Sequence, residues 1–356
     1  MGEICFEINY KGKNYVSKDG FEIISDNEYE EIYKQWYALP KLRDVLIEMS
    51  ALRKGGCVIS NITKYYFRKL MDNTLHYKCK WSINEVMESK ELLSVFVEKV
   101  KKNKKVFDSD NIIDNLDAAF RLGGKGIATK VAQFPVQTAD YILSKYNVNN
   151  CWYDYSCGWG GRLSSALKNK VNYYGTDPNY LLADKLVEYA NTYKKNQCYG
   201  ETFATHIYCQ GSEKFIPELE NKIGLAFSSP PYFLLEDYKI GQQSYKEGME
   251  YKDWLNFYLY PTMKNIHKYL ICDGFFIVNI KDFSKYTLEK DAIKCAEYAG
   301  FYLYATETLS NNARCASVGN GEFEMVDNDE NIYVFAKKGY APKTIDPKQI
   351  NMFDLF

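Results

Sequence analysis

The sequence is poor in the residues that bind metal ions. Its 356 residues include only three histidines, and none of its ten cysteines forms a Cys-x-x-Cys pair. Structural zinc sites are built mainly from such cysteine pairs and from histidines, so this composition argues against zinc and predicts that no metal is bound. The cysteines are expected to be reduced thiols, as in a cytosolic protein.

Long apolar runs and an excess of charge are also missing. No segment stays apolar for the roughly 20 residues that span a bilayer, and no signal peptide is recognisable, so we expect a cytoplasmic protein without a membrane partner. The net charge of -1 excludes a uniformly basic nucleic-acid-binding protein. Affinity for phosphates must then come from local patches. Frequent Tyr, Lys, Asn and Ile favour an AT-rich genome of bacterial, phage or mobile-element origin.

What the chain does have is apolar material for a large core. Hydrophobic residues make up 46% of the sequence, and the length exceeds that of one typical domain. We predict a main domain over residues 111–340. An N-terminal accessory region, residues 1–110, precedes it, and a tail, residues 341–356, follows it.

Within residues 111–340, strand-like runs alternate with helical stretches, which is the pattern of a parallel sheet covered on both faces. The predicted strands are residues 151–156, 171–176, 206–210, 223–228, 274–280, 302–308 and 331–337. A polar connection separates the last two, so we expect them to pair antiparallel. In the accessory region we expect a strand at 4–10 and helices at 27–37 and 82–101.

The tetrapeptide Ser229-Pro230-Pro231-Tyr232 directly follows the fourth predicted strand. Its two prolines fix φ and remove two backbone N–H groups, so the carbonyl oxygens there have no competing donors. With an aromatic ring just beyond, this turn suits a planar base whose exocyclic amino group must be held. The alternative is an ordinary strand-to-loop turn.

A glycine-rich turn follows the first predicted strand. Gly158, Gly160 and Gly161 let the backbone approach a ligand, and the next helix presents its N-terminus to an anion. Asp177, at the end of the second strand, is placed to accept hydrogen bonds from two ribose hydroxyls. A nicotinamide dinucleotide fingerprint requires glycine where Leu163 stands, so that cofactor fits badly.

Together these motifs resemble the S-adenosylmethionine (AdoMet)-dependent amino methyltransferases of nucleic acid, the DNA cytosine-N4 and adenine-N6 kind. Asp154-x-x-x-Gly158-x-Gly160 matches the AdoMet-binding loop of that family. Residues 229–232 match its catalytic motif, in which Asp, Asn or Ser precedes Pro-Pro and an aromatic. The resemblance implies a Rossmann-like class I methyltransferase fold, a doubly wound, seven-stranded, mostly parallel sheet whose last strand is antiparallel.

The family resemblance also covers the segment before the glycine-rich loop. Residues 130–140, which include Phe134 and Pro135, resemble the helix-opening segment that closes over the methionine end of the cofactor. Ser156 is implied to lie in the same cofactor site. Gln210 and Ser212, after the third strand, are candidates to contact the adenine of AdoMet, and the alternative for both is a solvated loop.

The family's chemistry assigns a role to each part of the catalytic turn. The amino group of a base flipped out of the duplex would be held by the Ser229 hydroxyl and the Pro230 carbonyl, while Tyr232 stacks on the ring. The expected function is DNA modification, for protection from a restriction nuclease partner. Two alternatives stay open: amino methylation of RNA, guanine N2 included, and a catalytically silent fold used as a binding module. The sequence leaves open cytosine versus adenine.

The two ends of the chain carry weaker signals. Residues 1–110 are expected either to recognise the target sequence or to cap the sheet. The segment from Gln349 to Phe356 resembles the short peptide with which replication proteins bind the sliding clamp, which would tether the enzyme to newly copied DNA. The alternative is that this apolar cluster docks on the protein's own surface.

Overall fold

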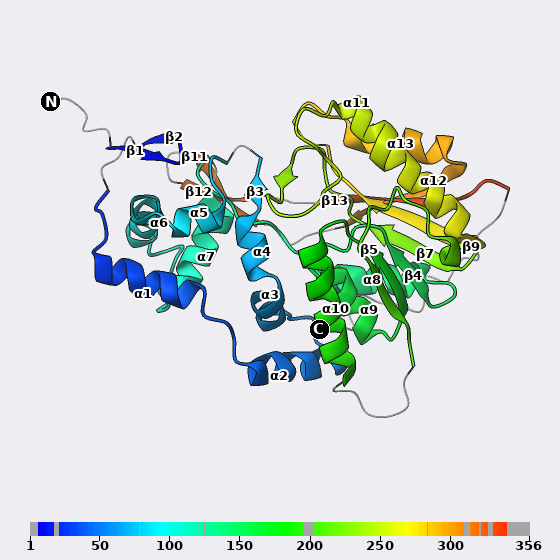
Figure 1. Cartoon of the computed structure of the whole chain (residues 1–356), viewed down its shortest axis with the longest axis horizontal. Coiled ribbons are helices and arrows are strands. Elements are labelled where there is room, and N and C mark those ends of the chain that lie inside the picture. Colours follow the sequence, from blue (N-terminus) through cyan, green and yellow to red (C-terminus); the bar gives the residue numbers. More distant parts are fainter. Residues whose placement is uncertain are drawn as a thin grey trace.

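The computed structural model describes residues 6–17, 21–77, 79–123, 126–195, 202–282, 284–309, 314–319, 322–326 and 330–339. An N-terminal part, blue and cyan in Figure 1, lies beside an α/β part that runs from green to orange. The C-terminal segment with the clamp-like motif lies outside the described residues. Within the described ranges, every helix is too short or too polar to cross a lipid bilayer.

A seven-stranded sheet carries the α/β part, in the order β10-β13-β9-β7-β4-β5-β6. The strands are β4 (Cys151–Asp154), β5 (Asn172–Thr176), β6 (Thr205–Tyr208), β7 (Ile223–Ser228), β9 (Leu270–Asn279), β10 (Phe301–Leu309) and β13 (Glu330–Lys337). Strand β13 runs antiparallel to both of its neighbours, β9 and β10, and all other adjacent strands of the sheet are parallel. This is the doubly wound, Rossmann-like, mostly parallel sheet that the sequence predicts, and the seven predicted strands are confirmed.

Helices cover both faces of this sheet (Figure 1). They are α8 (Val136–Tyr146), α9 (Gly161–Lys168), α10 (Tyr180–Lys195), α11 (Tyr251–Trp254), η2 (Leu255–Leu259), α12 (Tyr260–Tyr269) and α13 (Leu288–Tyr298). All six residues of β7 are buried, as expected of a strand that is covered on both faces. Leu225 and Phe227 pack with α8, α9 and α10, whereas Ala226 packs with α12 and α13, because successive side chains point to opposite faces.

The N-terminal part is mostly helical. Its elements are β1 (Phe6–Tyr10), β2 (Lys13–Ser17), α1 (Asp26–Trp36), α2 (Leu42–Arg53), α3 (Ser60–Tyr66), α4 (Arg68–Asn73), β3 (Leu75–His76), α5 (Ile83–Met87), α6 (Lys90–Lys102) and α7 (Ile112–Gly123). The predicted strand and the first predicted helix correspond to β1 and α1. The helix predicted over 82–101 is instead two helices, because the Ser89 hydroxyl accepts a hydrogen bond from Leu92 N at 3.2 Å and begins a new helix there.

The predicted domain boundary at residue 110 does not separate two hydrophobic cores. Phe120 of α7 packs against Trp36 and Phe96, inside the core of the N-terminal part. Helices α2, α3 and α4 belong instead to the core of the sheet, where Tyr66 meets Tyr189 of α10 at 5.5 Å between ring centroids. The two parts therefore interleave along the chain, and a fragment that begins at residue 111 would lose part of each core.

One strand pairing and one hairpin that packs on a helix join the two parts. Strand β3 pairs antiparallel with β8 (Glu236–Asp237), and the backbone N–H of Tyr77 donates to the Leu235 carbonyl at 2.7 Å. Strands β11 (Arg314–Gly319) and β12 (Glu322–Val326) form a hairpin that lies against α7 of the N-terminal part (Figure 1). The segment that follows the catalytic turn is thus held by the N-terminal part.

A buried ionic cluster lies at the seam between the parts. Asp72 accepts hydrogen bonds from the Trp36 indole at 2.8 Å and from Arg68 Nε at 3.4 Å. The Arg68 guanidinium stacks 3.8 Å from the Trp36 ring and also lies 3.5 Å from Asp117, which pairs with Lys130. Burial raises the pKa of the Asp72 carboxyl, and Arg68 opposes that rise.

Replacing Asp72 by alanine is expected to destabilise the fold strongly. Arg68 would keep its burial but lose its closest partner, and breaking a buried pair in this way costs about 3–5 kcal/mol. Glu188→Ala, which removes a surface pair with Lys185 at 2.6 Å, is the control and should cost less than about 1 kcal/mol. Urea unfolding measures both, and equal losses would contradict the role of the cluster.

Candidate active site

One large cavity opens at the carboxyl edge of the sheet. Its volume is about 810 Å³, within the range of small-molecule and cofactor sites. The chain that follows β4, β5, β6 and β7 lines it, together with the end of β9 and segment 235–246. In doubly wound sheets ligands bind at this edge, where the strand order reverses. Here the reversal falls between β4 and β7.

Most of the predicted site residues meet in this cavity. The lining includes Phe134, Pro135, Ser156, Gly158, Asp177, Ser212, Ser229, Pro230, Pro231 and Tyr232. Three predicted residues, Asp154, Gly160 and Gln210, do not line it. The roles assigned to the lining residues stay predictions, but their convergence from five separate segments is a property of the fold.

The glycine-rich loop is shaped by close approach to the segment before α8. Gly158 and Gly160 have positive φ, 56° and 79°. A Cβ at Gly161 would overlap the Phe134 carbonyl oxygen, so only glycine fits there. The Gln133 side-chain amide donates to the Trp159 carbonyl at 2.6 Å, which fixes the two segments together. Residues 133–135 thus lie over the loop.

Asp154 was predicted to bind the cofactor, and the structure corrects this. Its side chain is fully buried, and one carboxylate oxygen accepts from Arg162 Nε at 2.9 Å and from the Tyr173 hydroxyl at 2.7 Å. The other accepts from Ser156 N at 3.3 Å. Asp154 therefore holds the loop from below. The sequence could not show this, because Arg162 reaches back from the first turn of α9.

Gly160 and Gln210 also lie elsewhere than predicted. A Cβ on Gly160 would lie 2.9 Å from a ring carbon of Phe67, so this glycine faces the junction of α3 and α4 and not the cavity. Gln210 is half-buried, and its amide donates to the Lys214 carbonyl at 3.2 Å. Ser212 is buried in the cavity wall, where its hydroxyl hydrogen-bonds that of Thr262 at 2.9 Å.

Asp177 brings a desolvated carboxyl to the cavity. One oxygen accepts the backbone N–H of Asn179 at 2.9 Å. Burial raises the pKa of Asp177 from 3.8 to about 7, although hydrogen bonds from the backbone of Asn179 and Gly158 oppose the rise. Between these two pH values the unfolded chain ionises first, so this group lowers stability as pH rises toward 7. A ligand with hydroxyl donors would satisfy the carboxylate.

The catalytic turn is rigidly supported from below. The Trp152 indole donates to the Phe227 carbonyl at 2.9 Å, and the Tyr155 hydroxyl donates to the Ser228 carbonyl at 3.2 Å. Burial raises the pKa of Tyr232, and nearby Glu330 adds to the rise, so its hydroxyl stays neutral. Hydrogen bonding from the backbone of Lys281 and from Ser229 opposes the rise in the pKa of Tyr232.

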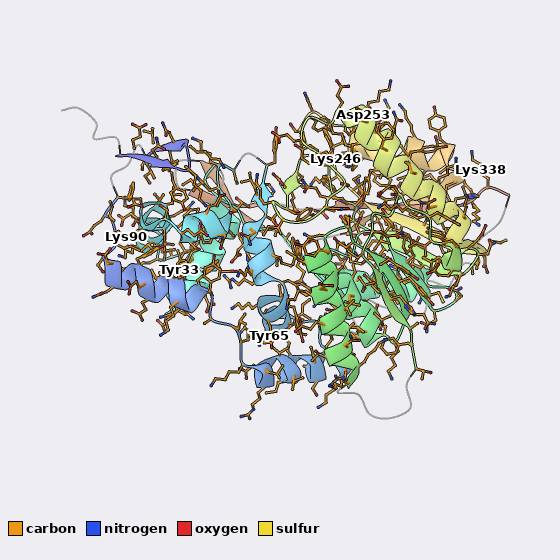
Figure 2. The ribbon with its side chains drawn as sticks, viewed as in Figure 1. Tyr33, Tyr65, Lys90, Lys246, Asp253 and Lys338 are labelled. Carbon is orange, nitrogen blue, oxygen red and sulfur yellow. The ribbon has the colours of Figure 1, made fainter. Side chains whose placement is uncertain are left out.

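Other lining residues come from segments without a recognisable motif. Tyr258, whose hydroxyl lies 3.1 Å from the Ser156 hydroxyl, stands on η2, a π-helix of the kind that often marks functional sites. Tyr238 donates to Glu236 at 3.0 Å, and burial raises the pKa of Glu236 to about 7. Lys246, labelled in Figure 2, lies between β8 and α11. Only folding brings these residues to the cavity.

Acidic groups dominate the charge of this cavity. Arg162 is neutralised by Asp154. The remaining charged lining residues in the described part of the chain are Asp177, Glu213, Glu236 and Glu330 on the acidic side and Lys214 and Lys246 on the basic side. Four carboxyls against two ammonium groups favour a ligand with net positive charge and disfavour one rich in phosphates. No group of three His, Cys, Asp or Glu side chains among the described residues is arranged to hold a metal ion.

Comparison with known proteins adds structural neighbours only. No protein-family model matches the chain, and no curated protein matches it in sequence. It is similar in structure to a precorrin-6Y C5,15-methyltransferase from Geobacter metallireducens, with 13% identity and a TM-score of 0.37 over 58% of this chain and 100% of that one. A TehB-like SAM-dependent methyltransferase from Corynebacterium glutamicum shows 17% identity and a TM-score of 0.36 over 57% and 86%. These similarities assign no reaction or substrate to this chain.

The close contact at Gly161 predicts that even one methyl group is not tolerated. Gly161→Ala should destabilise the fold by about 1–3 kcal/mol, because the added carbon displaces the Phe134 backbone from the loop. Gly12→Ala is a matched control, since Gly12 has a φ of 73° but open space around its Cβ position. Thermal unfolding of the two variants separates crowding from backbone strain. A smaller loss at Gly161 than at Gly12 would contradict the packing argument.

Proposed function

We propose that this protein transfers a methyl group from AdoMet to the exocyclic amino group of a base in DNA, cytosine N4 or adenine N6. One observation carries the proposal. The Ser229–Tyr232 turn and the glycine-rich loop open on the same cavity, from the neighbouring strands β7 and β4. An amino group held at the first and a methyl donor held at the second would face each other at close range, which is the main requirement of methyl transfer.

The cavity suits AdoMet in shape and in charge. Asp177 offers an acceptor for ribose hydroxyls, and the contact between Gly161 and the Phe134 backbone brings residues 133–135 over the loop where the methionine end would lie. AdoMet carries a sulfonium, an ammonium and one carboxylate, so its net charge is positive and matches the acidic lining. The cofactor supplies a methyl group that is activated by its sulfonium. Nicotinamide dinucleotides bring two phosphates to the same acidic surface and fit it less well.

The residues of the turn would prepare the acceptor. The lone pair of an aromatic amine is delocalised into the ring, so the nitrogen attacks poorly until its hydrogens are held. The Ser229 hydroxyl and the Pro230 carbonyl would accept those hydrogens and favour a tetrahedral nitrogen, with its lone pair directed at the methyl carbon. Tyr232 would stack on the ring.

The choice of DNA as substrate is supported by the resemblance of the motifs. RNA as substrate and a silent binding module are the alternatives that the same assays test. A role in modification beside a restriction nuclease, and binding of residues 349–356 to the sliding clamp, complete the proposal. Mixing the clamp with the full chain and with a chain ending at residue 348 tests the clamp contact.

Binding of AdoMet should depend on the ionisation of Asp177. The protonated carboxyl accepts ribose hydroxyls poorly, so affinity should rise as pH rises through about 7. Asp177→Asn should weaken binding by roughly 1.5–3 kcal/mol and remove this pH dependence. Calorimetric titration at several pH values measures both effects. Gln210→Ala, outside the cavity, is the control, and an Asp177→Asn variant that binds like the wild type refutes the assignment.

Substitutions in the catalytic turn should separate chemistry from cofactor binding. Tyr232→Ala should lose base stacking, worth about 1–3 kcal/mol, and leave AdoMet affinity nearly unchanged. Ser229→Ala should slow methyl transfer more than it weakens DNA binding, because its hydrogen bond strengthens in the transition state. Tritiated methyl transfer to unmethylated DNA is the measurement. Unchanged rates in both variants place the chemistry elsewhere.

A further inference from the structure

Asn279 stands beside Ser229 at the end of the neighbouring strand. Strands β7 and β9 are parallel, and Ser228 is paired with Val278, so the next residues, Ser229 and Asn279, lie side by side. Both side chains line the cavity. No sequence motif marks Asn279, which becomes a candidate only through the strand register.

A hydrogen bond to strand β13 holds the side chain of Asn279. The side chain is only 2% exposed, and its Nδ2 donates to the Asn331 carbonyl of β13 at 3.2 Å. Strand β9 lies between β13 and β7, so this bond ties the Asn279 side chain to β13, on the side of β9 away from Ser229. Among the described residues, the amide oxygen has no hydrogen-bond partner, and the second N–H of the amide has none either. Buried polar groups of this kind normally have partners.

The sheet order assigns Asn279 to the acceptor half of the cavity. The predicted cofactor residues follow β4, β5 and β6, on one side of β7. Asn279, Leu309 and Glu330 line the cavity from β9, β10 and β13, on the other side. The catalytic turn after β7 stands between the two halves. A group on the β9 side therefore faces the molecule that receives the methyl group.

We propose that Asn279 determines which bases the catalytic turn accepts. While Ser229 and Pro230 hold the two hydrogens of the exocyclic amine, the free N–H of the Asn279 amide donates to the adjacent ring nitrogen. Cytosine (N3 and N4) and adenine (N1 and N6) both present an acceptor beside an amino donor, which complements a carboxamide. Guanine presents two donors, N1–H and the N2 amino group, and leaves the Asn279 N–H facing another donor. This inference rests on the proposed function and names the residue that would restrict it to these two bases.

Product analysis tests the inference without knowledge of the recognition sequence. The full-length protein is incubated with AdoMet and random-sequence DNA or RNA, and the nucleosides are identified by mass spectrometry. N4-methylcytosine or N6-methyladenine is expected. N2-methylguanine as the main product overturns the assignment of Asn279 and the proposed choice of base, but leaves AdoMet-dependent amino methylation standing. Absence of any methylated base, although AdoMet binds, overturns both.

Ring-nitrogen analogues test the role of the amide directly. In duplexes that carry 3-deazacytosine or 1-deazaadenine at the target, the ring nitrogen is replaced by carbon. Wild-type kcat/KM should fall by about 100-fold or more beyond the intrinsic effect of the analogue, because the buried N–H is left unpaired. Asn279→Ala should be slow on both substrates and discriminate little between them. An equal preference in the wild type and in Asn279→Ala overturns the proposal.

Two controls separate this role from a structural one. The Asn279→Ala variant should bind AdoMet with wild-type affinity, because Asn279 lies on the far side of the catalytic turn. Asn115→Ala replaces another buried asparagine, in α7 and away from the cavity, and should keep the wild-type preference for the ring nitrogen. If Asn279→Ala does not fold, the wild-type comparison on the two analogues still decides, since equal rates on normal and deaza targets refute the inference.

Discussion

The buried pair between Asp154 and Arg162 is the interaction on which the site depends. Arg162 donates to Asp154 at 2.9 Å and to the Ser156 carbonyl, and its guanidinium lies 5.2 Å from the centre of the Phe134 ring. One side chain thus connects the end of β4, the loop and the covering segment. Both charges are almost wholly buried, so loss of either would leave an uncompensated charge in the core. The Asp154–Arg162 pair therefore fixes the shape of the glycine-rich loop.

The features that could be predicted from the sequence are those that a local sequence pattern determines. All seven sheet strands can be recognised in the sequence from strand-like runs between polar turns. The Ser229–Tyr232 turn can be recognised from its two prolines. Residue contacts that depend on tertiary structure escaped prediction. Asp154 matched a motif, but its direction is set by Arg162 and Tyr173. Asn279 carries no motif and acquires meaning only from its register with β7. The division of the predicted helix 82–101 at Ser89 could have been predicted, since a serine before a helical run is a known N-cap.

The buried carboxyls of the cavity also indicate what kind of ligand it suits. Asp177 and Glu236 are carboxyls kept from water, and burial raises the pKa of each to about 7, although the charge of Arg162 opposes the rise at Asp177. Such groups destabilise the empty protein at neutral pH, and a stable fold tolerates them only where a ligand offsets their cost. The acidic lining of the cavity therefore points to ligand binding and not to a role in stabilising the core.

The N-terminal part is packed closely against the sheet. Helices α2, α3 and α4 share the core of the sheet, and the Arg68–Asp72 cluster closes the seam. Strand β3 holds β8, which carries Glu236 into the cavity, and Tyr77 bonds Leu235 one residue earlier. A ligand that shifted the N-terminal part would therefore move the wall of the cavity with it. These contacts run without a break from the N-terminal part to the wall of the cavity.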